Sequence, residues 1–282
     1  MQRGSNAGSG LSRAGARWWA LACQPLLALC VAANPATPVP GSSCDKPIYL
    51  TFDTGHMGVA PLVAQVLSRH GVRVTFFAAQ EKTQEGDGSL GSHWAGWWRT
   101  RAAEGHAFAS HTFDHAYWRA DLPGEPARFR IRPSAGPRAG QDLTWTAAEY
   151  CAELDRASDR LREVTGQTPL PLFRAPGGKT SPRLLAAARQ CGYAHVGWSP
   201  AGFLGDELPS EAFPNRALLD KALREIRSGD ILVAHLGIWS RQDPWAPSVL
   251  EPLVTGLQAR GFCFRTLRDH PRYKDWIAAR GR

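Results

Sequence analysis

Short apolar runs alternate with longer amphipathic stretches along most of the chain. The runs are rich in β-branched and aromatic residues, which is typical of strands that are buried on both faces. Between them, apolar residues recur with the period of a helix. The alternation predicts a mostly parallel α/β domain of about seven strands, either open or closed into a barrel. The predicted strands are residues 48–52, 72–78, 107–110, 170–174, 194–198, 230–235 and 262–267.

The stretches between the runs contain the signals at which helices begin and end. One predicted helix has an apolar face that includes Leu62, and it stops at Gly71. Thr146 and Glu149 have the spacing of a capping box, and Gly166 ends the helix that they open. The predicted helices are residues 59–70, 94–104, 146–165, 181–191, 217–228 and 248–260.

Two stretches lack this alternation. Residues 83–98 are rich in glycine and then in tryptophan, and residues 119–145 have little periodicity. Long loops inside a compact domain often border a functional site. We therefore expect these stretches to be loops that border such a site or simply cover the domain.

The N-terminal region has the pattern of a secretory signal. Its first 17 residues contain three arginines and no acid, residues 18–33 are largely apolar, and the apolar segment ends on small residues. An uncleaved membrane anchor and lipidation at Cys30 are the alternatives. The predicted organisation is a signal peptide (1–33), a Pro-rich linker (34–46), one catalytic domain (47–270) and a C-terminal tail (271–282).

The charge and the cysteines limit the choice of partner and compartment. The formal net charge is +8, and removal of the three arginines of the signal segment leaves 8 − 3 = +5, with the basic residues scattered. This distribution indicates a solvated surface, and nothing in the sequence resembles a nucleic-acid-binding module. Four cysteines follow the signal, without a CxxC motif. We favour the pairs Cys44–Cys263 and Cys151–Cys191, with four free thiols as the alternative.

Chemically active residue types follow the predicted strands. Asp53, His111, Arg174, Trp198 and His235 each lie at or just after a strand end. Because the carboxyl ends of parallel strands meet at one edge, these side chains should converge. A carboxylate base, a histidine acid and a metal-bound water would make a metal-assisted amide hydrolase.

Two short motifs refine this interpretation. His111 and His115 are four residues apart, so on a helical turn both imidazoles would face one cation. Arg174 precedes a Pro-Gly-Gly turn. There Arg174 would hold a carboxylate ionised and the backbone N–H groups would serve as oxyanion donors, with a plain turn as the alternative.

The order TFD, HTxxH, RxPxG and AH resembles the polysaccharide deacetylase family with the NodB homology domain, carbohydrate esterase family 4. The four motifs lie between Ile48 and Leu267, which is most of the predicted mature chain. The resemblance implies a distorted (β/α) barrel and removal of N-acetyl groups from amino sugars, usually with zinc.

The resemblance also implies a role for each matching residue. Asp53 would be the base, Arg174 would position it, Gly177 would supply the oxyanion N–H and His235 would be the general acid. His111 and His115 would bind the metal. Val233 and Trp198 would line the pocket for the acetyl methyl group.

Two positions depart from the family pattern. Thr54 stands where the family usually has an Asp as the third metal ligand, so we expect a weakened divalent-metal site, with Asp114 or His56 as possible replacements. The Asp that usually follows the motif-four Trp is also absent, and Ser199 and Asp206 are the residues nearby that could tune His235.

We therefore expect a periplasmic or secreted, monomeric hydrolase that acts on carbon–nitrogen bonds other than peptide bonds. Its partner would be an N-acetylated envelope glycan such as peptidoglycan, with no nucleic acid and no stable membrane span in the mature chain. The alternatives are a deacylase of a small or lipid-linked amino sugar and a glycan-binding pseudoenzyme.

Aromatic faces that stack on sugar rings would fit a glycan groove, with core packing as the alternative. The candidates are Trp94, Trp97, Trp98, Trp118, Trp239 and Trp245.

Overall fold

The structure is a computed structural model that describes residues 44–280. The predicted signal segment and residues 34–43 of the predicted linker lie outside the described residues. Within the described range, no helix has the length and apolar character that crossing a membrane requires.

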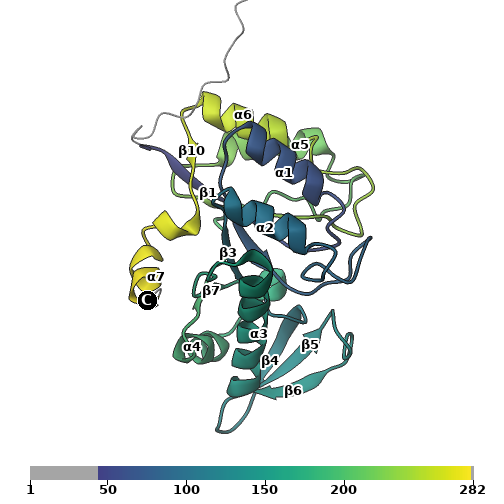
Figure 1. The fold of residues 1–282 in the computed structure, drawn as a ribbon, viewed down its shortest axis with the longest axis vertical. Helices are drawn as coiled ribbons and strands as arrows, with labels where there is room; N and C mark the ends of the chain where they lie inside the picture. Colours follow the sequence, from purple (N-terminus) through teal and green to yellow (C-terminus); the bar gives the residue numbers. More distant parts are fainter. Residues whose placement is uncertain (1–43, 281–282) are drawn as a thin grey trace, which may run out of the picture. The chain divides into compact units, whose positions relative to one another are not determined.

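Seven parallel strands form one sheet, as the alternation predicts (Figure 1). The sheet follows the order β10-β1-β2-β3-β7-β8, and β9 also pairs with β1. An isolated bridge from Phe203 to Val233 links β9 to the chain that follows β8, so the fold is a distorted (β/α) barrel. The strands are β1 (Pro47–Asp53), β2 (Thr75–Ala78), β3 (Ala107–Ser110), β7 (Leu172–Phe173), β8 (Ala194–His195), β9 (Ile231–His235) and β10 (Cys263–Phe264).

The helices begin and end largely where their capping signals lie. Thr146 accepts a hydrogen bond from the Glu149 backbone and Glu149 accepts one in return, which confirms the capping box of α3. Ser181 caps α4 in a similar way through the backbone N–H of Leu184. The helices are α1 (Ala60–Arg69), α2 (Ala95–Ala103), α3 (Ala147–Thr165), α4 (Pro182–Gln190), α5 (Asn215–Glu225), α6 (Leu250–Ala259) and α7 (Lys274–Arg280).

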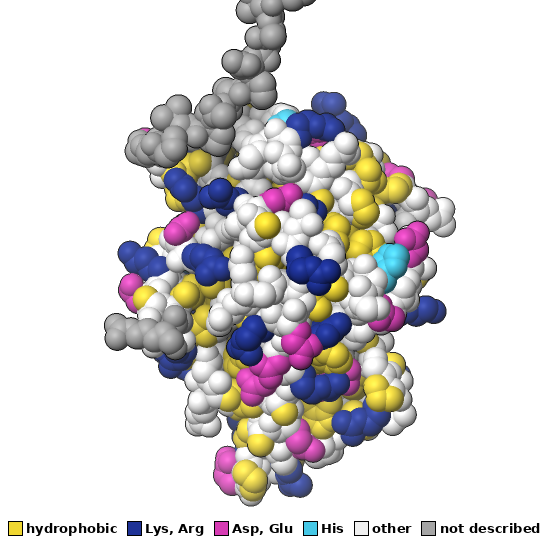
Figure 2. Space-filling model, in the orientation of Figure 1, with side chains coloured by type: hydrophobic (Ala, Val, Ile, Leu, Met, Phe, Trp, Pro, Cys, Tyr) yellow, Lys and Arg dark blue, Asp and Glu magenta, His cyan; other side chains and the backbone are white. Residues whose placement is uncertain are grey.

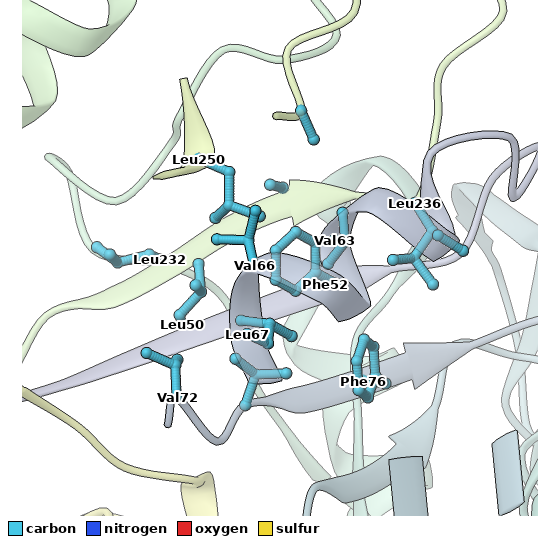
Figure 3. Packing of buried hydrophobic residues seen from close by; sticks show 14 of the residues in the cluster. Leu50, Phe52, Val63, Val66, Leu67, Val72, Phe76, Leu232, Leu236 and Leu250 are labelled. Carbon is cyan, nitrogen blue, oxygen red and sulfur yellow. The ribbon is translucent and has the colours of Figure 1, made fainter. Parts of the chain in front are cut away.

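Strand β1 is buried on both faces, which explains its continuous apolar sequence. Leu50 and Phe52 pack on one side in a cluster with α1 and α6, and Figure 3 shows these contacts. Tyr49 points to the opposite side, where Phe77 also lies. Because side chains alternate along a strand, Asp53 continues the face of Tyr49 and so reaches the barrel interior. Leu62 of α1 does not join the apolar cluster and is exposed, contrary to the sequence-based expectation.

Residues 119–145 are not a loop, and here the expectation from sequence is wrong. They belong to a three-stranded antiparallel sheet of β4 (Ala116–Leu122), β5 (Arg128–Pro133) and β6 (Leu143–Thr146), drawn below the barrel in Figure 1. Phe129 and Ile131 alternate with exposed arginines and pack under Trp145 and α3. This sheet therefore covers α3 and α4 and delivers Tyr117 to the barrel mouth.

Both favoured disulfides are present. Cys44–Cys263 ties the start of β1 to β10, and Cys151–Cys191 ties α3 to the end of α4. The predicted tail contains α7, and the Tyr273 hydroxyl just before this helix donates to the His195 carbonyl. Basic side chains are interspersed with acidic and apolar ones on the face drawn in Figure 2, as the scattered charge predicts.

Candidate active site

The predicted strand-end residues converge on one cavity of about 460 Å³. Asp53 and His235 are register partners at the ends of β1 and β9, which places both at its floor. This volume lies in the range of small-molecule sites. Of the residues predicted from the sequence, the following line the cavity: Asp53, His111, His115, Gly177, Trp198, Val233 and His235.

Arg174 is fully buried behind Asp53 and fixes its carboxylate. One guanidinium nitrogen lies 2.7 Å from Asp53 Oδ1 and donates also to the Thr51 hydroxyl. The remaining nitrogens donate to the carbonyls of Val196 and Gly197. Burial alone would raise the pKa of Asp53, but the charge and hydrogen bond of Arg174 hold it below its usual value. Asp53 is therefore an ionised carboxylate that can accept a proton.

His111 is held in the orientation that a metal ligand needs. Its Nδ1 lies 2.8 Å from the carbonyl oxygen of Arg174, so this nitrogen carries the proton and Nε2 keeps a free lone pair. Nε2 faces Asp53 Oδ2 at 3.6 Å. Burial lowers the pKa of His111 to about 4, which keeps the ring neutral at physiological pH.

The two histidines meet through an irregular turn, and the prediction of a helical turn is wrong. Thr112 and His115 both have positive φ angles, 59° and 49°. The Thr112 hydroxyl accepts a hydrogen bond from the backbone of Ala116 and so stabilises this turn. The ring centroids of His111 and His115 lie 4.8 Å apart, and His115 Nδ1 is 2.5 Å from the Ser134 hydroxyl.

Glu81 is a site residue that the sequence analysis missed. It lines the cavity, its Oε2 accepts a hydrogen bond of 2.5 Å from the Thr54 hydroxyl, and its Oε1 lies 3.9 Å from His115 Nδ1. Glu81 comes three residues after the end of β2, the neighbour of β1, so the strand-end rule could have identified it. Thr54 itself is buried.

The two residues considered as replacements for the missing Asp are engaged elsewhere. Asp114 forms an ion pair with Arg156 at 3.4 Å, and His56 packs its ring against Trp239. Neither lines the cavity that contains the histidine pair.

Asp206 is the carboxylate partner of His235, in place of the Asp that usually follows the motif-four Trp. Its Oδ1 lies 3.1 Å from His235 Nδ1, and its Oδ2 accepts the backbone N–H of His235. Burial works to lower the pKa of His235, but the buried carboxylate of Asp206 outweighs it and raises this pKa to about 9. His235 is therefore an imidazolium near neutral pH and can donate a proton. Ser199, the other candidate, instead accepts the backbone N–H of Ile231.

The Pro-Gly-Gly turn lies against the aromatic wall of the cavity. Gly177 and Gly178 have φ angles of 64° and 67°, in the left-handed region that favours glycine. A Cβ on Gly177 would lie 2.8 Å from the Tyr117 ring, so only glycine fits this close approach. The Gly178 N–H is occupied by the Ala175 carbonyl, which leaves the Gly177 N–H as our candidate oxyanion donor.

Few of the tryptophans proposed for sugar stacking are at the site. Trp94, Trp98 and Trp245 are buried in the main core, where the alternative of core packing is the correct one. Trp198 and the exposed Trp239 line the cavity, together with Phe203.

The donor set of the cavity fits a divalent cation. The imidazoles of His111 and His115 line this space together with carboxylates that include Glu81. Each of the two imidazoles has its Nδ1 in a hydrogen bond, His111 with the Arg174 carbonyl and His115 with the Ser134 hydroxyl. Across residues 44–280, however, no three His, Cys, Asp or Glu side chains stand close enough together to hold an ion as they are placed.

Comparisons with known proteins agree with the geometry. The family model described as polysaccharide deacetylase matches residues 41–196, more than half of the chain. The chain is 29% identical over 230 residues to a chitooligosaccharide deacetylase of Azorhizobium caulinodans, covering 78% of this chain and 92% of that protein. It is 26% identical over 230 residues to the peptidoglycan-N-acetylmuramic acid deacetylase PdaA of Bacillus subtilis, covering 81% of this chain and 73% of that one.

The fold is also similar to a solved structure. A family 4 acetyl xylan esterase from Clostridium thermocellum, in complex with a cobalt ion, superposes with a TM-score of 0.61 at 19% identity. The match covers 84% of this chain and 97% of the esterase.

Proposed function

Because the chain belongs to the polysaccharide deacetylase family, we propose that it is a hydrolase that removes N-acetyl groups from amino sugars of an envelope glycan such as peptidoglycan. One observation carries the proposal. Asp53 and His235 face the same cavity with their pKa values shifted in opposite directions. Such a pair has the protonation states of a base and an acid at the same pH.

Asp53 is the general base of the proposed reaction. Its carboxylate takes a proton from the attacking water, whose oxygen forms a bond to the acetyl carbonyl carbon. The hydrogen bond and charge of Arg174 keep this carboxylate ionised and aimed into the cavity.

A divalent metal, zinc in our proposal, would polarise the acetyl carbonyl and acidify the water when bound. His111 and His115 are the imidazoles that would hold it, with Nε2 of His111 free for this purpose.

Gly177 and His235 act on the later part of the reaction. The Gly177 N–H stabilises the negative oxygen of the tetrahedral intermediate. His235 then gives its proton to the sugar nitrogen as the carbon–nitrogen bond breaks. The products are acetate and a free amine, and Asp206 stabilises the charge that His235 carries beforehand.

The walls of the cavity suit an acetylated sugar. Val233 and Trp198 supply an apolar surface for the acetyl methyl group, and the exposed face of Trp239 offers a stacking surface for a sugar ring.

We also propose that the chain is exported and monomeric. Its two disulfides support an oxidising compartment, and detection of the chain only in the cytoplasm with Met1 intact would contradict export.

The test is acetate release from a panel of N-acetylated substrates in the presence of zinc. The panel contains N-acetylglucosamine, chitooligosaccharides and peptidoglycan fragments. We expect acetate and free amine in equal amounts from at least one oligosaccharide, with Asp53→Asn reduced by about 10²–10⁴-fold.

A matched control is Asp220→Asn, which removes an exposed carboxylate that pairs with Arg216 on α5. This variant should keep full activity. Binding of an oligosaccharide without any acetate release would contradict the proposal and favour a pseudoenzyme.

A further inference from the structure

Thr54 is already committed to two hydrogen bonds that leave it poorly suited to be a metal ligand. Its hydroxyl donates to Glu81 Oε2 at 2.5 Å and accepts the backbone N–H of Ala79 at 3.1 Å. A neutral hydroxyl is also a weaker ligand for a divalent cation than a carboxylate. Thr54 therefore lacks the anionic oxygen that the family pattern has at this position.

Glu81 supplies a carboxylate beside Thr54 from the loop that follows the neighbouring strand, β2. The Thr54 N–H donates to the Phe77 carbonyl, so the ends of β1 and β2 are directly joined there. Glu81 follows β2 and points back across this junction, with Oε1 3.9 Å from His115 Nδ1. A carboxylate from the loop after β2 thus contacts the residue at which the family pattern has a carboxylate at the end of β1.

The loop that holds Glu81 is fixed in place. The Glu81 N–H donates to the Ser89 hydroxyl, and the Glu81 carbonyl accepts the Ser89 N–H. Ser89 is fully buried and its hydroxyl donates to the Ala79 carbonyl. A carboxylate anchored on both sides of its backbone is preorganised, which lowers the entropy lost when an ion binds.

Among the described residues, the Glu81 carboxylate also lacks an ion pair with a lysine or an arginine. In this part of the chain, its ion-pair partner within 4.0 Å is His115. Asp53, which lines the same cavity, has Arg174 instead. A half-buried carboxylate that faces an imidazole and lacks a basic partner is the arrangement that a bound cation would neutralise.

We propose that Glu81 is the third protein ligand of the metal site, with His111 and His115, and that Thr54 positions it. The inference deepens the proposed function, because it assigns a ligand of the same site. It also explains the departure at position 54. An Asp there would place a second negative charge beside Glu81 and the two carboxylates would repel each other, whereas the Thr54 hydroxyl donates a hydrogen bond to Glu81.

The test is calorimetric titration of zinc into the metal-free full-length chain. Glu81→Gln keeps the size of the side chain and removes the anionic oxygen, and we expect its zinc affinity to fall about 100-fold. Glu85→Gln, in the same loop but with a solvent-exposed side chain, should bind zinc as tightly as the wild type. Melting temperatures of the metal-free variants establish that each one is folded.

A carboxylate exchange sharpens the test. Thr54→Asp combined with Glu81→Gln restores the family arrangement and should recover zinc affinity relative to Glu81→Gln alone. Thr54→Val, which keeps the shape of Thr54 but not its hydroxyl, should weaken zinc binding by about 10-fold.

The outcomes separate this inference from the proposed function, because zinc binding is measured without a substrate. Wild-type affinity in Glu81→Gln, with affinity lost in His111→Gln, would overturn the role of Glu81. Absence of zinc binding in the wild type would overturn the metal site as a whole. Loss of zinc by Glu81→Gln in a chain that releases no acetate would support the ligand assignment while the proposed deacetylase activity failed.

Discussion

Asp206 holds His235 at two points, its backbone N–H and its ring Nδ1. The double contact fixes the ring so that Nε2 faces the cavity, and it places a buried negative charge beside the imidazole. Asp206 thereby sets the orientation of His235 and raises its pKa most strongly, and the carboxylates of Asp53 and Glu207 add to this effect.

This relationship predicts how stability depends on pH. The pKa of His235 rises from 6.5 to about 9 in the folded chain, so its contribution to stability is fully present below pH 6.5. That contribution, about 3 kcal/mol at most, is lost as the pH rises through 9. Urea unfolding from pH 6 to pH 10 should show this loss in the wild type and a smaller one in Asp206→Asn. Equal slopes in the two chains would contradict it.

Asp53 and Arg174 should behave as a coupled pair in unfolding experiments. Asp53→Asn leaves the fully buried guanidinium without its anionic partner, and we expect a loss of about 3–5 kcal/mol. The double variant Asp53→Asn/Arg174→Met removes both charges and should be less destabilised than the sum of the two single variants. Additive losses in this double-mutant cycle would mean that the pair is not energetically coupled.

Gly177→Ala should lower turnover by more than the strain of an alanine at a positive φ angle would cause by itself. The new methyl group would lie 2.8 Å from the Tyr117 ring and would displace the turn that presents the proposed oxyanion donor. We expect a fall in kcat of about 10²–10³-fold. Gly140→Ala is the matched control, because Gly140 also has a positive φ but has open space around it. A similar kcat in both variants would remove Gly177 from catalysis.

The disulfides should stabilise the domain to a measurable degree. Cys151–Cys191 spans 40 residues and Cys44–Cys263 spans 219. Replacement of either pair by serine should cost about 2–4 kcal/mol, because each bridge restricts the unfolded chain. Chemical unfolding under non-reducing conditions measures this, and an unchanged midpoint for both double variants would show that the thiols are free in solution.

Much of the fold and the site follows from local rules in the sequence. The apolar runs predict all seven strands of the sheet, and the capping box at Thr146 predicts where α3 begins. Asp53, His111, Arg174 and His235 are predictable because parallel strands bring their carboxyl ends to one edge.

The missed features depend on tertiary structure or on a weak local signal. Strand β5 alternates arginine with Phe129 and Ile131, but its burial requires α3, which comes later in the chain. Glu81 reaches Thr54 across 27 residues, so their spacing forms no sequence motif. Asp206, 29 residues before His235, is one of the two candidates that the sequence offers, and only the structure decides between it and Ser199. The turn between His111 and His115 uses positive φ angles at non-glycine residues, which residue preferences disfavour.

The most direct test of the acid–base account is the pH dependence of kcat/KM for acetate release in the wild type and in Asp206→Asn. If His235 is the general acid, kcat/KM of the wild type falls as the pH rises through about 9, where His235 loses its proton. Without the Asp206 carboxylate the pKa of His235 drops, so this fall should move to lower pH in Asp206→Asn. A falling limb at the same pH in both chains would contradict the assignment of His235 as the acid that protonates the departing amine.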